Sequence, residues 1–136
     1  MKKKSIIEFL IVLLVTTSGL TYLNNWEKKF KKSLLESGNF AIGNFVKFSM
    51  GYYLSGRSYH YYYYNKQRKK VFTTGSRGMP EREMRNKMKK GDQFFVIYNN
   101  DGASIFFDKP IKDSTDYKRY VKEFEEKRKQ KTKKKN

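Results

Sequence analysis

The sequence predicts an α+β protein in which a hydrophobic helix precedes a small antiparallel β domain and a second helix follows it. Two observations carry this prediction. An apolar stretch of 18 residues, Ile6 to Leu23, follows Lys2, Lys3 and Lys4. Farther along, two runs rich in aromatic and β-branched residues flank a connector that ends in Asp101-Gly102. Such a connector favours a tight hairpin turn between two strands.

Length and charge limit the choice of architecture and partner. At 136 residues the chain has room for one domain, and its net charge is +18. That excess favours an anionic partner such as nucleic acid, whose phosphates release counterions on binding. However, Lys is much commoner here than Arg, whereas bidentate recognition of phosphate or guanine favours Arg. The chain has no Cys, which excludes disulfides and thiolate metal sites.

The apolar stretch is predicted to be a transmembrane anchor or a signal peptide. As a helix it spans about 27 Å, just short of a typical hydrocarbon core. The alternative is a cleaved signal peptide. Lysines on both sides nearly cancel the positive-inside rule, but the N-terminal pattern favours export of the domain to the periplasm or cell surface. The residues expected at the membrane interface, where the lysines would meet anionic headgroups, are Tyr22, Trp26, Lys28 and Lys29.

The next segments predict a barrel of about five strands, SH3-like or OB-like. A juxtamembrane helix over 24–37 ends at Gly38. Strand-like patterns follow at 40–53, at 58–64 and at 69–74, and Pro80 opens a short helix before the hairpin. The hairpin's first strand is apolar on both faces and is therefore expected to be central.

The C-terminal part predicts an amphipathic helix and a basic tail. Residues 108–111 leave the sheet, and Ser114 or Thr115 can cap the helix. Its apolar stripe is formed by Tyr117, Tyr120, Val121 and Phe124. The tail has no apolar residue and is expected to be disordered. The resulting division is an anchor or signal peptide over 1–23, a juxtamembrane helix over 24–37, a barrel over 38–112, a helix over 113–126 and a tail over 127–136.

The candidate binding surface lies on the strand predicted at 58–64, which we call the tyrosine strand. Tyr59, Tyr61 and Tyr63 share one face, and His60, Tyr62 and Tyr64 share the other. If the second set points outward, it resembles the stacking-plus-charge surface of single-strand nucleic-acid binders. The favoured interpretation instead places one tyrosine face inside the barrel and covers the other with a terminal helix. The residues of the predicted surface are Tyr62, Tyr64, Lys66, Arg68, Lys69 and Lys70.

Catalysis has little support in this sequence. The only histidine is His60, and the acidic residues lie where a helix start, a turn or a charged helix explains them. No nucleophile elbow surrounds a serine, and Gly75-Ser76-Arg77-Gly78 is too short for a phosphate-binding loop. We therefore expect no enzymatic activity, no cofactor and no metal site.

A resemblance to known proteins is carried by residues 34–38 with Ile42-Gly43, by the tyrosine strand, by 90–98 and by 108–111. These segments resemble short bacterial membrane proteins of unknown function that carry one N-terminal hydrophobic segment and a small barrel-like β domain. The resemblance implies a fold and a membrane address but no activity. At Asn99-Asn100 the chain departs from those proteins, which commonly have a proline there. The expected function is a membrane-anchored, non-enzymatic interaction module of the bacterial envelope, and the alternative is a basic nucleic-acid-binding protein.

Overall fold

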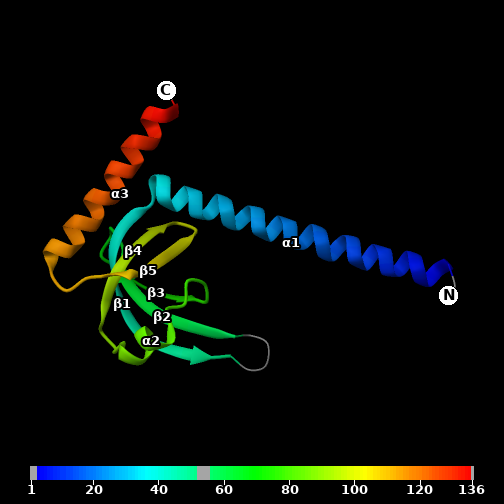
Figure 1. Cartoon of the computed structure of the whole chain (residues 1–136), viewed down its shortest axis with the longest axis horizontal. Coiled ribbons are helices and arrows are strands. Elements are labelled where there is room, and N and C mark those ends of the chain that lie inside the picture. Colours follow the sequence, from blue (N-terminus) through cyan, green and yellow to red (C-terminus); the bar gives the residue numbers. More distant parts are fainter. Residues whose placement is uncertain (1–2, 52–55, 136) are drawn as a thin grey trace. The chain divides into compact units, whose positions relative to one another are not determined.

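The computed structural model describes residues 3–51 and 56–135, and it confirms the α+β class. The chain divides into two compact units, residues 1–33 and residues 34–136. Figure 1 shows the path of the chain through its helices and strands. In chain order these are α1 (Lys3–Ser37), β1 (Asn39–Met50), β2 (Arg57–Tyr64), β3 (Lys70–Gly75), α2 (Arg82–Lys87), β4 (Gln93–Asn99), β5 (Gly102–Pro110) and α3 (Ser114–Lys135).

Helix α1 is continuous, so no break separates the predicted anchor from the predicted juxtamembrane helix. It contains no proline, and the hydroxyl groups of its polar patch donate hydrogen bonds back to the helix itself. Thr16, for example, donates to the carbonyl of Leu13 at 2.9 Å, and Thr17 does so at 2.9 Å. Such bonds satisfy polar groups where no water is present. The helix is long and apolar enough to cross a membrane.

The five strands form one antiparallel sheet in the order β3-β2-β1-β4-β5. The hairpin strand β4, expected to be central, has neighbours on both sides. The sheet is open, and the predicted SH3-like or OB-like barrel is not confirmed: within the described part of the chain, no ladder joins β3 to β5. Closure would need these two end strands to pair, but β3 is only 6 residues long and leads into the loop before α2.

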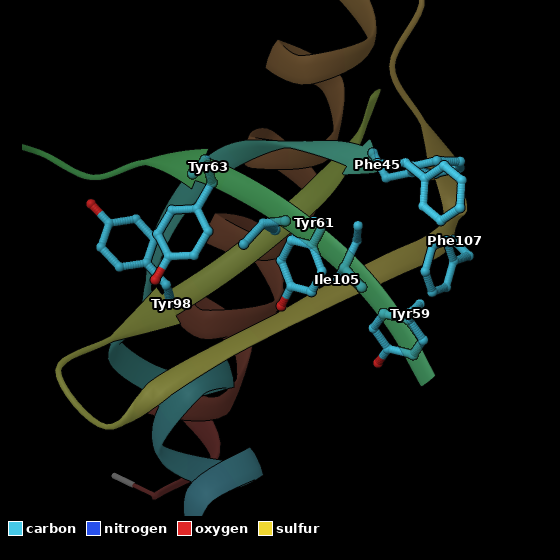
Figure 2. Packing of buried hydrophobic residues seen from close by; sticks show 10 residues of the cluster. Phe45, Tyr59, Tyr61, Tyr63, Tyr98, Ile105 and Phe107 are labelled. Atoms are coloured by element: carbon cyan, nitrogen blue, oxygen red, sulfur yellow. The ribbon is translucent and has the colours of Figure 1, made fainter. Parts of the chain in front are cut away.

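The main core lies on the sheet face that carries the odd-numbered tyrosines of β2. Tyr59, Tyr61 and Tyr63 are buried against aromatic and aliphatic residues of β1, β4 and β5, as Figure 2 shows. Tyr59 meets the edge of Phe107, and Tyr63 packs on Tyr98 with ring centroids 4.8 Å apart. The period of two along β2 therefore places every second tyrosine in the core.

Helix α3 covers the opposite face over β4 and its neighbours. Phe124 stacks on Phe95 with a centroid distance of 5.3 Å, and Tyr120 packs on the same ring at 5.7 Å. The apolar stripe predicted from sequence thus contacts the domain. The predicted serine or threonine cap is wrong, because Asp113 Oδ1 accepts the hydrogen bond from the backbone N–H of Asp116. A carboxylate also suits the positive end of the helix dipole.

Two further segments differ from the sequence-based expectation. Helix α3 continues to Lys135 where a disordered tail was expected. Its last turns contain no helix breaker, and lysines near a helix C-terminus are favoured by the dipole. Strand β5 continues to Pro110, which pairs with Phe94. Proline is tolerated there because β5 is an edge strand. The end of the predicted strand 40–53 lies outside the described residues.

Candidate interaction surface on the β2–β3 hairpin

The β2–β3 hairpin closes through a short loop. The backbone N–H of Asn65 donates to the carbonyl of Lys69 at 3.0 Å, and the loop lies between these two residues. Arg68 has a φ of 60°, the left-handed conformation typical of a three-residue hairpin loop with a bulge. Asn65 Oδ1 also accepts the N–H of Lys69 at 3.0 Å. The turn is therefore fixed by local backbone and side-chain bonds.

Four side chains form a surface beside this turn, which we name the hairpin patch: Tyr64, Lys70 and Phe72, which are exposed, and Tyr62, which is half-buried. They lie on the face opposite to the tyrosine core. Phe72 is 70 % exposed and Tyr64 is 53 % exposed. Phe72 lies opposite Tyr62 in the ladder, with ring centroids 5.7 Å apart, and Tyr62 meets Tyr64 edge-on at 6.1 Å. An exposed aromatic group of this kind is typical of a binding surface.

The lysine of the hairpin patch is seated on its rings. Lys70 Nζ lies 4.0 Å from the ring centroid of Tyr62 and 4.9 Å from that of Phe72. These are cation–π distances, worth about 0.5–1 kcal/mol at an exposed site. The contacts keep a positive charge at the centre of an apolar surface.

In the sequence around the hairpin patch, every charged residue is basic. No Asp or Glu occurs between Glu36 and Glu81, a segment that contains β1, β2 and β3. The hairpin and its flanks instead carry Arg57, Lys66, Arg68, Lys69, Lys70 and Arg77. A surface with this charge attracts anionic partners and raises their association rate.

The structure brings together only part of the predicted binding surface. Tyr62, Tyr64 and Lys70 lie in the hairpin patch, whereas Lys66, Arg68 and Lys69 belong to the turn at its end. Phe72 was missed, although the alternation of Lys70, Phe72 and Thr74 along the third strand would have placed it on this face. The expected cover by a terminal helix is also incomplete, since Tyr64 and Phe72 stay exposed while α3 packs on Phe95.

A cleft of about 370 Å³ lies on the other side of β3. Val71 and Thr73 line it from β3, and the β4–β5 turn lines it from the opposite side with residues that include Asn99 and Asp101. At its base the backbone N–H of Lys66 donates to the Tyr98 hydroxyl at 2.8 Å, which joins the hairpin turn to β4. Strand β3 thus has the hairpin patch on one face and a cleft on the other.

The only histidine of the sequence, His60, lies on β2. Both ring nitrogens of His60 are hydrogen-bonded within the sheet, Nδ1 to Thr74 Oγ1 at 2.9 Å and Nε2 to the Ser49 hydroxyl. Among residues 3–51 and 56–135, no group of three or more His, Cys, Asp or Glu side chains could hold a metal ion. A second cleft, of about 510 Å³, lies between α2 and the start of β4, where Met84 and Met88 line it.

The residues expected at the membrane interface all lie on α1. Tyr22 and Trp26 are exposed, and the Trp26 ring stacks on Phe30 with centroids 5.4 Å apart. Lys28 and Lys29 are exposed on the following turn. This order, apolar span, aromatic residues, then lysines, is typical of a helix that leaves a membrane.

No protein family, curated protein or solved structure matches the chain. Of the expected resemblance, the structure shows the coarse features alone, an N-terminal apolar helix and a five-stranded antiparallel sheet. The bacterial origin stays a prediction.

Proposed function

We propose that the protein is a membrane-anchored, non-enzymatic binding module that presents the hairpin patch to an anionic partner protein. Helix α1 holds the domain at the membrane, with the domain exported to the periplasm or cell surface. The observation that carries the proposal is the exposure of Phe72 and Tyr64 in a basic hairpin. Exposing large aromatic side chains is costly in water, and a partner that covers them recovers that free energy.

Single-strand nucleic-acid binding is the second candidate. It is favoured by aromatic rings beside lysines, because bases stack on such rings and phosphates meet the charges. Two contacts weigh against it. Lys70 already occupies a ring face of Tyr62, and Tyr62 meets Tyr64 at 88° rather than in parallel steps that successive bases could follow.

The test is site-specific cross-linking of the full-length protein in its native membrane. A photoreactive benzoylphenylalanine replaces Tyr64, and we expect a discrete cross-linked product that survives nuclease treatment. Phe72→Ala should abolish that product, since it removes the most exposed ring of the patch. Met50→Ala is the matched control, because Met50 is 77 % exposed but lies outside the patch. A product that Phe72→Ala leaves intact, or that nuclease removes, contradicts the proposal.

A further inference from the structure

We propose that β3 accepts an extended acidic peptide of the partner as a sixth strand of the sheet. The inference rests on the proposed function and names the partner's chemistry: an apolar residue opposite Phe72, with an acidic residue two positions along opposite Lys70. Peptides bind sheet edges in this way through backbone hydrogen bonds, and alternate side chains supply specificity.

The first step is the free edge. In the described part of the chain, β3 pairs only with β2 and ends the sheet. The backbone bond from Asn65 to Lys69 identifies that pair as a hydrogen-bonded one. Because hydrogen-bonded and non-hydrogen-bonded pairs alternate along an antiparallel ladder, the backbone N–H and C=O groups of Lys70, Phe72 and Thr74 point away from β2. An incoming strand would meet these groups.

The second step is the side chains that such a strand would touch. Lys70 and Phe72 belong to the hairpin patch, so peptide residues directly opposite them lie on the same face. The peptide residues in between point to the other face, beside the cleft that Val71, Thr73 and Asp101 line. Uncharged residues suit those positions, because an acidic side chain there would meet the carboxylate of Asp101.

The third step is charge and ring geometry. No carboxylate occurs in the sequence from β1 to β3 to repel an acidic peptide, and Lys70 Nζ is held over two rings where a partner carboxylate can approach it. Residues two positions apart in a strand lie on the same face, so an extended peptide can present carboxylates at that spacing on the face of the hairpin patch. The free backbone groups of β3 favour a peptide over a nucleic acid, because only a strand can pair with them.

The test measures binding of labelled probes to the full-length protein in detergent micelles by fluorescence anisotropy. The first probe is the peptide Thr-Glu-Thr-Val-Thr-Glu-Thr. The second has the same sequence with N-methyl groups on the Glu and Val amides, which in antiparallel pairing removes the backbone donors that face β3 and leaves the charge unchanged. The third replaces Glu with Lys, and the fourth is oligothymidylate.

We expect the first probe to bind, and the N-methylated and Lys probes to bind at least about tenfold more weakly. Phe72→Ala and Lys70→Glu should each weaken the first probe by a similar factor. Met50→Ala and Lys87→Glu are controls that change an exposed apolar and an exposed basic residue outside the patch. Circular dichroism confirms that each variant is folded.

Three results would overturn strand addition: no binding of the first probe, N-methylation without effect, or tighter binding of oligothymidylate that Phe72→Ala abolishes. The last result would also favour single-strand nucleic-acid binding as the function of the hairpin patch. If the cross-link from the Tyr64 position persists while the first probe fails to bind, the proposed function stands and only the strand-addition geometry is wrong.

Discussion

The side chain of Arg128 forms hydrogen bonds with the C-terminal end of α1. Its guanidinium donates to the carbonyls of Leu35 at 2.7 Å, Gly38 at 2.8 Å and Leu34 at 3.2 Å, and it lies 4.7 Å from the ring centroid of Phe40. The last carbonyls of a helix have no partner within the helix. Arg128 therefore acts as a side-chain cap supplied from α3, and partial burial lowers the pKa of the guanidinium without removing its charge.

We expect Arg128→Gln to lower the free energy of unfolding by about 1–2 kcal/mol, since it removes charge-assisted bonds to α1 carbonyls. Lys129→Gln is the control, because its side chain is exposed on the next residue of the same helix. Urea unfolding in micelles, followed by circular dichroism, measures both variants. Equal stability of the two would show that the cap contributes nothing.

The end of α1 could be predicted from Gly38, but the reason why this position requires glycine could not. The sequence predicts that the helix stops at Gly38, and α1 ends at Ser37. Glycine commonly ends helices in a left-handed conformation, yet Gly38 is not among the residues with positive φ. A Cβ at Gly38 would instead lie 2.5 Å from Leu34 O and 2.5 Å from Ile97 Cγ2. Glycine is needed for close approach to β4, which no single-sequence pattern reveals.

Strand β2 is the element in which alternation separates two roles. The core set of tyrosines carries phenol groups that burial keeps neutral: desolvation raises the pKa of Tyr59, Tyr61 and Tyr63, and neighbouring phenols add to the shift at Tyr61. The set on the other face contributes to the hairpin patch. The face of each tyrosine followed from the sequence, but which part of the second face stays exposed depends on where α3 packs on it.

Burial of these phenols predicts a loss of stability at alkaline pH. A tyrosine in the unfolded chain ionises near its ordinary pKa of 10.0, whereas the folded protein holds Tyr61 protonated to higher pH. The stabilisation is therefore fully present below pH 10 and is lost as the pH rises above that value. Denaturant unfolding at about pH 8 and about pH 11 measures the loss.

The matched variants are Tyr61→Phe and Tyr64→Phe, which remove a buried and an exposed hydroxyl from the same strand. Tyr61→Phe should make stability fall less steeply above pH 10, and Tyr64→Phe should follow the wild type. Identical pH dependence of all three proteins would refute the assignment of the alkaline loss to Tyr61.

At the scale of the whole molecule, the coarse architecture could be predicted and the closure of the sheet could not. Apolar runs and turn residues located α1, the strands and the apolar stripe of α3, because hydrophobic periodicity and turn-forming residues are local properties of the sequence. Whether β3 pairs with β5 depends on strand lengths and on the path through α2, which are not local. Because these properties are not local, the sequence pattern predicted a closed barrel, and the free edge of β3 was not predicted.

The exposed apolar span of α1 predicts that the full-length protein pellets with membranes and resists carbonate extraction. Leu13→Arg places a charge near the centre of the span, at a cost of about 2.5–3.5 kcal/mol to insertion, and should shift protein out of the membrane fraction. Leu23→Arg is the control at the end of the span. A mature species shortened by about 20 residues would instead identify a cleaved signal peptide.

The contacts of Arg128 also order events during synthesis, which proceeds from the N-terminus. The end of α1 therefore leaves the ribosome before Arg128, which follows Leu35 by 93 residues, has been synthesised. Until Arg128 emerges, the carbonyls of Leu35 and Gly38 lack its guanidinium as a donor, whereas the carbonyl of Leu34 can still accept the backbone N–H of Gly38 at 2.9 Å. If α1 inserts into a bilayer, its insertion can thus precede the packing of α3 on the sheet.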